Sequence, residues 1–449
     1  MHTRHAVVEM ITAFVCTLVA GMSLLLPIDF AWTSESTALQ LDMLAFSVPR
    51  AIAVGAIVAV LVAVFATTMN HGLAAWGSAL SGITIMFVNH LAGHHASPVA
   101  PLSTLNFVDS IAGGILLGGI AAAVLRGRLQ VFGWTLGALA SVVISAAMPV
   151  PHTGDLADPA KALHWPAVDS PPLWLIEITL ALVFFGTLAN RRRTEIERRA
   201  FELPMAPILA GLLYITVALF GSEWLARRSA NVVDIALAVA ATVVTAVIAA
   251  MLLPRRDGSL VLLAAALSSV GGAIVPSQLP GWAAPLLVLA LAVGIVVGFR
   301  RPAPLVAMLV LAGLALFGVL TSGPGDNGLL HAATLGLVLA ASGGYCFGCA
   351  APRYNPTRVL GIAIVLGSSV VLALRDHLSR GDFANATLDA GHWSTASVPM
   401  VHSAIAYWMA LAITAGCAVS LVLLRRWRAP MVAPVSAPVP DPPALPEDS

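Results

Sequence analysis

The chain contains fourteen stretches of about 20 mainly apolar residues, the length of α-helix that crosses the hydrocarbon core of a membrane. Their approximate ranges are 6–28, 50–68, 72–92, 107–125, 129–149, 171–189, 204–222, 232–253, 258–275, 282–299, 303–320, 329–349, 357–374 and 399–424. Only 10% of the residues are charged, against about 25% in typical soluble domains. Several connections, such as 254–258, are too short to hold a soluble domain. The sequence therefore predicts an all-α polytopic membrane protein with about fourteen transmembrane helices.

Basic residues mark one side of the predicted bundle. Short cytoplasmic loops of membrane proteins retain Lys and Arg, so the positions of these residues orient the chain. With the N-terminus inside, 17 of the 23 basic residues fall on the cytoplasmic side, among them Arg126, Arg128, Arg300 and Arg301. All basic residues except Lys161 are arginine, which is typical of a GC-rich bacterial genome. We expect a multi-pass protein of the cell inner (plasma) membrane with both termini cytoplasmic.

The densest basic segment is NRRRTEIERRAFELP at 190–204, with five arginines within nine positions. We interpret it as a cytoplasmic anchor between the sixth and seventh helices, and a nucleotide or lipid-headgroup site is the alternative. The last segment, 428–449, is rich in proline and cannot bury a core, so it is predicted to be a disordered cytoplasmic tail.

Ionisable residues inside the apolar stretches are candidates for function, because a charge at bilayer depth is costly and usually faces a cavity or the bundle interior. The acids and histidines concentrate toward the outer ends of their helices: Asp29, Asp109, Glu177, Asp234, His90, His331 and His402. Such a vestibule could bind a cation or relay protons, because histidine titrates near neutral pH. Residues near a helix end can also reach the headgroups without a function. We select Asp29, Asp109 and Glu177 as candidate coupling or substrate-binding residues.

Other motifs give little indication of chemistry. His90 and His94 have the i,i+4 spacing of a shared metal, but no acid or cysteine adjoins them in sequence, so we interpret them as loop histidines. Cys346 and Cys349 form a CxxC within an apolar run, which we interpret as packing residues. The chain has no P-loop, GxSxG or HExxH motif, and its net charge is +1. We expect no enzymatic activity, cofactor, metal or nucleic-acid partner.

Two segments eight helices apart resemble each other. Residues 124–145 and 349–371 both place two arginines in a turn and then continue into a glycine-containing apolar helix. Two six-helix halves separated by two inserted helices would give this offset. The predicted organisation is an N-terminal half (1–189), a basic loop with two inserted helices (190–256), a C-terminal half (257–427) and the tail (428–449).

This arrangement resembles the major facilitator superfamily, specifically its fourteen-helix drug:proton antiporter branch. The helix count, the RGR turn at 126–128 and the glycine-rich segment before the basic turn at 353–358 carry the resemblance, which implies two halves that alternate access to a central site. Asp29, in LLPIDFAW, is the counterpart of the family's first-helix acid. The segment TTMNHGLAAWG at 67–77 has neither the acid nor the arginines of the family pattern, and the fifth helix lacks the Gly-Pro antiporter motif. These departures leave proton coupling open.

The leading functional hypothesis is a transporter that exports a hydrophobic or amphiphilic, lipid-like small molecule by alternating access, with proton coupling as an option. One alternative is a non-catalytic membrane subunit of a larger complex. Another is a polyprenyl-sugar-dependent glycosyltransferase that uses an acid of the first outer loop, where Asp29, Glu35 and Asp42 lie. The partners expected from the sequence are the lipid bilayer and a small hydrophobic or lipid-like substrate, and the sequence leaves a protein partner open.

Overall fold

A computed structural model describes most of the chain. The described residues are 2–26, 38–69, 71–95, 102–147, 170–191, 205–227, 231–254, 257–274, 281–322, 329–350, 352–372, 387–389, 392–394 and 404–427. Three predictions lie outside these residues: the role of Asp29, most of the arginine cluster (192–199) and the disorder of the tail (428–449).

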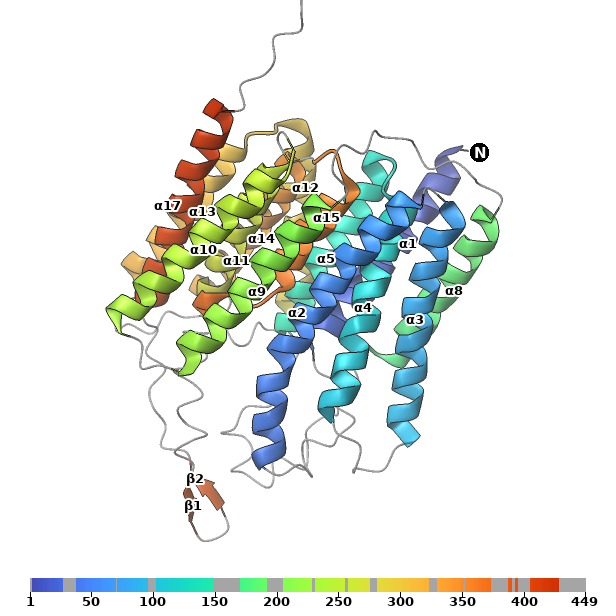
Figure 1. Cartoon of the computed structure of the whole chain (residues 1–449), viewed down its shortest axis with the longest axis horizontal. Helices are drawn as coiled ribbons and strands as arrows, with labels where there is room; N and C mark the ends of the chain where they lie inside the picture. The colour runs from blue at the N-terminus through green and yellow to red at the C-terminus, as the bar shows by residue number, and fades with distance from the viewer. Residues whose placement is uncertain are drawn as a thin grey trace, which may run out of the picture.

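The described residues form a helical bundle with one small β-hairpin (Figure 1). The helices are α1 (His2–Leu25), α2 (Ala38–Thr68), α3 (Gly72–His95), α4 (Leu102–Val124), α5 (Arg128–Ala147), α8 (Leu173–Asn190), α9 (Ala206–Arg227), α10 (Val232–Leu252), α11 (Gly258–Ile274), α12 (Ala284–Arg300), α13 (Pro304–Thr321), α14 (Leu329–Ala350), α15 (Asn355–Leu366) and α17 (Ala404–Trp427), with the 3-10 turn η2 (Gly281–Ala283) before α12. The strands β1 (Thr387–Asp389) and β2 (His392–Ser394) pair antiparallel. Each predicted apolar stretch corresponds to one of these helices.

Twelve of the helical segments are long and apolar enough to cross a membrane, which confirms a multi-pass, helical membrane protein. The other two apolar helices, α11 and α12, have 17 residues each and lie at the lower limit of spanning length. The number of fourteen crossings therefore stays a prediction. The hairpin is an addition to the expected all-α fold, and it lies within the predicted outer loop at 375–398.

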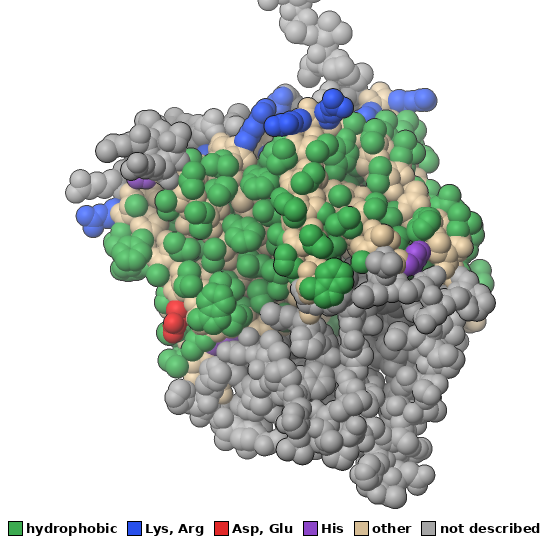
Figure 2. All heavy atoms as spheres, turned by 180° about the vertical axis from the view of Figure 1, so that it is seen from behind, with side chains coloured by type: hydrophobic (Ala, Val, Ile, Leu, Met, Phe, Trp, Pro, Cys, Tyr) green, Lys and Arg blue, Asp and Glu red, His purple; other side chains and the backbone are tan. Residues whose placement is uncertain are grey.

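One end of the bundle is basic. Figure 1 places the N-terminus and the end of α17 at the same end of the molecule, as an even number of crossings requires. Figure 2 shows Lys and Arg side chains along this upper edge and hydrophobic side chains over the face below it. The described basic residues thus gather where the positive-inside pattern places the cytoplasm.

The packing between helices repeats along the chain. Within the first six helices, α2 packs on α4, α1 on α5 and α3 on α8. Within the last six, α12 packs on α14, α11 on α15 and α13 on α17, which are the equivalent pairs eight helices later. Two further contacts join the two sets of helices, one between α2 and α15 and one between α5 and α12. These two contacts are also equivalent, because replacing each helix by its counterpart eight helices away converts one into the other. The helices α9 and α10 pack on each other and on the side of this arrangement, against α2, α11, α15 and α17.

An ion pair attaches α9 to α2. Arg50 Nε lies 2.7 Å from Glu223 Oε1, and Arg50 Nη2 lies 3.0 Å from Glu223 Oε2. The guanidinium therefore donates two hydrogen bonds to the carboxylate in a bidentate pair. Both residues lie toward the end of the bundle opposite the basic edge.

Small residues allow the closest contact in the first set of helices. A Cβ atom at Gly114 of α4 would collide with the carbonyl oxygen of Gly55 on α2, and one at Gly118 would collide with that of Ala59. Alanines on α2, including Ala56 and Ala63, are fully buried at this contact. Gly114 and Gly118 form a GxxxG motif that brings the two helices into close contact, because only glycine leaves room for the neighbouring backbone.

We predict that Gly114→Ala lowers the thermal unfolding temperature of the purified protein in detergent. The added methyl group must push α2 and α4 apart, and overpacking of this kind costs about 1–3 kcal/mol. The matched control is Gly77→Ala on α3, where a Cβ meets no atom within 4 Å. Equal unfolding temperatures for the two variants would contradict the close contact.

Candidate functional site

A cavity of about 230 Å³ lies between α1 and α5 on one side and α11, α12, α14 and α15 on the other. Its walls include Leu25, Leu139, Val142, Leu267, Leu291, Leu339 and Leu366. Among the described residues of the lining, the only polar side chains are the hydroxyls of Ser268 and Ser369, and none is charged. A Cβ atom added at Gly271 would meet open space, as expected for a backbone segment that borders a cavity.

The cavity lies toward the end of the bundle opposite the basic edge. Leu25 is the last residue of α1, Ile274 is the last residue of α11, and Leu287 is close to the beginning of α12. Drug-sized ligands occupy pockets of about 300–1,000 Å³. The cavity in this conformation therefore has room for a small apolar group, and the lining chemistry favours a neutral, hydrophobic occupant.

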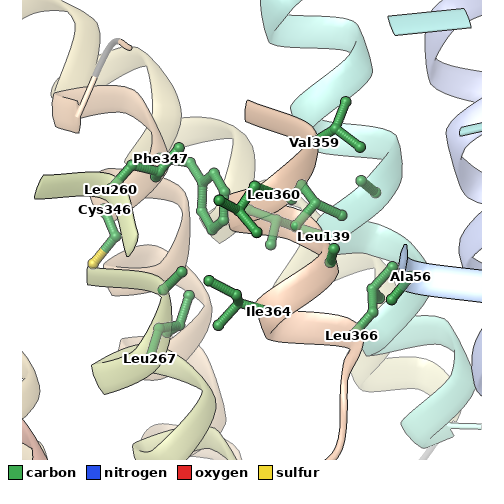
Figure 3. Close-up of a cluster of buried hydrophobic side chains, with 14 of the residues drawn as sticks. Ala56, Leu139, Leu260, Leu267, Cys346, Phe347, Val359, Leu360, Ile364 and Leu366 are labelled. Atoms are coloured by element: carbon green, nitrogen blue, oxygen red, sulfur yellow. The ribbon is translucent and has the colours of Figure 1, made fainter. Parts of the chain in front are cut away.

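Helix α15 lies at the centre of the packing between the cavity and the basic edge. Figure 3 shows its side chains Leu360 and Ile364 directed toward Leu267 and Phe347, while Leu366 lies near Leu139 and Ala56. All of these side chains are buried, at most 6% exposed. The apolar contacts of α15 thus reach helices from both ends of the sequence.

Cys346 belongs to the same cluster, and both it and Cys349 are buried free thiols. The interpretation of the CxxC as packing residues is confirmed.

A set of hydrogen bonds lies at the basic end of the bundle, on the side of α15 away from the cavity. Asn355, the first residue of α15, donates from Nδ2 to the carbonyl oxygen of Leu125 after α4, at 3.0 Å. The Asp257 carboxylate, in the turn before α11, accepts from the backbone N–H groups of Arg353 (3.1 Å) and Tyr354 (3.3 Å). It also accepts from Thr357 Oγ1 at 3.4 Å. We call Asp257, Asn355 and Leu125 the α15 latch, because they tie the beginning of α15 to α4 and α11.

Asp257 is a buried acid at a helix N-terminus. Its residue is 3% exposed, and burial raises the pKa of its carboxyl above the ordinary value near 3.8. The hydrogen bonds from Arg353, Tyr354 and Thr357 and the charge of Arg358 lower this pKa but only partly offset burial. From the sequence, residues 254–258 were predicted only as a short connection and Asp257 was not recognised, although an acid is favourable near a helix N-terminus.

The predicted residue Asp109 is fully buried between helices and meets a histidine. Its Oδ1 atom lies 3.4 Å from Nδ1 of His90, and both side chains are at most 1% exposed. The same His90 nitrogen lies 3.1 Å from the carbonyl oxygen of Met86. The pair sits between α3 and α4, which contact each other along their length. The structure thus brings together an acid and a histidine that the sequence placed only at a similar depth. The interpretation of His90 and His94 as loop histidines is wrong, because both residues lie within α3.

The three predicted site residues do not converge on the cavity within the described part of the chain. Asp109 does not line it, and Glu177 is exposed on the surface of α8. Asp29 and Glu35 lie outside the described residues, and Asp42 lies in the first part of α2. Asp234 is buried in the first turn of α10. Among the described residues, no group of three His, Cys, Asp or Glu side chains could hold a metal ion.

Asn355 and the cavity hydroxyls of Ser268 and Ser369 were also not predicted from the sequence. Asn355 stands directly before Pro356, a residue typical of the first turn of a helix, which was the available indication of a helix start. The serines have no such indication, because hydroxyls are common in membrane helices.

No protein-family model and no curated protein sequence matches the chain. Among solved structures, the chain is similar to the crystal structure of a major facilitator superfamily transporter, FucP, in the outward conformation, with 13% identity and a TM-score of 0.43. It is also similar to the E. coli fucose:proton symporter FucP (N162A), with 11% identity and a TM-score of 0.42. Each comparison covers 94% of this chain and 98% of the other. At these values the similarity assigns the chain to no family.

We predict that the stability of the protein responds to the protonation of Asp257. Because the folded-state pKa is raised, the contribution of this carboxyl is full below its ordinary pKa and is lost as the pH rises through the folded-state value. Thermal unfolding of the wild type, compared with Asp257→Asn between pH 4 and 7, should therefore show an additional loss of stability toward neutral pH. A constant difference between the two proteins over this range would contradict the prediction.

Proposed function

We propose that the protein is a transporter that moves a neutral hydrophobic or amphiphilic small molecule by alternating access between two six-helix halves. The halves are α1–α8 and α11–α17, and α9 and α10 are the inserted pair. The observation that carries this proposal is the repeat of helix packing at an interval of eight apolar helices. If the halves are related by a two-fold axis, each contact between them must have an equivalent contact in which the halves change places. The α2–α15 contact has such an equivalent in the α5–α12 contact.

The place of the cavity supports this proposal. Its walls come from α1 and α5 of the first half and from α11, α12, α14 and α15 of the second. Transporters of repeated halves bind their cargo at such an interface and open it to each side in turn. Here the cavity lies toward one end, and the α15 latch joins the halves at the other end through Asn355 and Leu125. Release of this latch would open the basic end.

The proposed family is the fourteen-helix branch of the major facilitator superfamily, in a bacterial plasma membrane with both termini cytoplasmic. In this orientation the latch closes the cytoplasmic side and the cavity lies toward the external side. Export of a lipid-like cargo fits a lining that offers hydrocarbon and two hydroxyls. Asp29 and Glu177 remain proposed cargo or coupling residues.

Asp109 is the proposed coupling residue, together with His90. Ionisable residues buried between transmembrane helices are expensive and typical of proton relays. A carboxyl and an imidazole 3.4 Å apart can hold one proton between them and change their net charge when a second one binds or leaves. Because the pair lies between α3 and α4 and not in the cavity lining, its charge would act on the packing of the first half.

We predict that Asp109→Asn reduces transport driven by a pH gradient at least about tenfold, a loss typical of removing an essential proton-transfer group. The measurement is uptake of a fluorescent hydrophobic probe into proteoliposomes that contain the purified chain, with and without the gradient. His90→Gln should have the same effect. The matched control is Asp234→Asn, a buried acid in the inserted helix α10, which should transport as the wild type does.

Equal loss in Asp109→Asn and Asp234→Asn would remove the pair from the mechanism. Failure of the wild type to move any probe would oppose transport and favour the second candidate, a non-catalytic membrane subunit. One observation favours that candidate. Glu177 is exposed on α8, and only 22% of the residues in this span are buried, the smallest share among the twelve spans. A helix that meets a partner would have such a surface.

We predict that Asn355→Ala opens the basic end of the cavity more often. A Ser268→Cys thiol in the cavity should then react several-fold faster with a membrane-impermeant maleimide added from the cytoplasmic side of inside-out vesicles. All four natural cysteines are buried, so their background reaction is low. The control is Asn190→Ala, since the Asn190 amide donates within its own helix, to the carbonyl oxygen of Gly186. Equal rates for the two variants would show that the latch does not close this end.

A further inference from the structure

A second apolar hollow lies on the outer surface of the bundle, away from the central cavity. It has a volume of about 580 Å³, and its floor is α14 with α12 and α13 as walls. The lining residues Leu289 and Val293 of α12, Val310 of α13 and Leu337 of α14 are between 40% and 60% exposed. We call this hollow the α12–α14 groove. The groove and the cavity lie on different faces of α12: Leu287 and Leu291 line the cavity, whereas Leu289 and Val293 line the groove.

The groove runs along α12 toward the basic edge of the protein. The lining positions Leu286, Leu289, Val293 and Val297 follow each other at intervals of three and four residues, so they share one face of the helix. Arg300 comes three residues after Val297 and continues this face as the last residue of α12. From Leu286 to Arg300 the helix rises by about 21 Å, more than the thickness of one leaflet of hydrocarbon, about 15 Å.

Two arginines end the groove at the basic edge. Arg300 and Arg301 are adjacent and exposed. Tyr345, which lines the groove, donates its hydroxyl to the carbonyl oxygen of Arg301 at 2.9 Å. This bond holds the turn after α12 against the end of the groove. The arrangement therefore combines a long hydrocarbon surface with a pair of exposed cations at the basic edge.

We infer that the α12–α14 groove binds the acyl chain of an anionic phospholipid whose headgroup meets Arg300 and Arg301. An acyl chain fits the uncharged lining, and guanidinium groups bind phosphate with several parallel donors. A second copy of this chain fits less well. Two copies in one membrane place their basic edges at the same level, so Arg300 and Arg301 would face like charges. The inference is independent of transport through the central cavity.

The test is native mass spectrometry of the purified full chain in mixed micelles with phosphatidylglycerol and phosphatidylcholine of identical acyl chains. The wild type should retain phosphatidylglycerol preferentially. Arg300→Gln with Arg301→Gln should lower this preference on the order of tenfold, because each basic residue near an anionic lipid contributes to binding. The matched control is Arg425→Gln with Arg426→Gln, an equally exposed pair at the end of α17. Arg300→Lys with Arg301→Lys should keep most of the preference.

A second variant tests the hydrocarbon part of the site. Val293→Trp fills the groove and should reduce retention of both lipids, whereas Leu309→Trp, at an exposed position of α13 outside the lining, should not. The inference is overturned by equal effects of the two arginine pairs or by equal retention in the two tryptophan variants. It is also overturned by a wild-type dimer that Val293→Trp converts to a monomer, because the groove then holds a second copy.

Discussion

The structure depends on the absence of water from the hydrocarbon core of the membrane. A backbone N–H or carbonyl group there must find its partner within the protein, and the α-helix satisfies nearly all of them inside one segment. This constraint explains why the described residues are almost entirely helical. It also explains why hydroxyls within the spans, such as Thr17 and Thr414, donate to carbonyl oxygens one turn earlier in their own helices.

Hydrocarbon surroundings remove the usual reason for helices to associate, because lipid tails are as apolar as leucine. Close backbone contact takes over this role, and glycine permits it. Gly114 and Gly118 let α4 meet α2 in the first set of helices. Gly294 and Gly344 do the same for α12 and α14, the equivalent pair eight helices later, where an added Cβ would collide with the neighbouring carbonyl oxygens. The repeated packing thus has a repeated physical cause.

Helix α15 shows how polar and apolar contacts are divided by depth. Its apolar side chains pack in the interior against α2, α5, α11 and α14. Its polar contacts lie at the basic end, where Asp257 accepts three hydrogen bonds and Asn355 donates to Leu125. Of these hydrogen bonds, the one from Asn355 to Leu125 reaches the first six helices, and it lies at the basic end.

The sequence by itself determined the number and approximate positions of the apolar helices and the basic edge, because hydrophobic length and arginine position are properties of single segments. It also singled out Asp109 as a buried acid. Only the tertiary structure decided that Asp109 meets His90, that Glu177 faces outward and that the cavity is bordered by serines. Asp257 and Asn355 likewise gained their roles there. These properties depend on which face of each helix turns toward which neighbour, and nearly uniform apolar sequences carry little periodicity to decide this rotation.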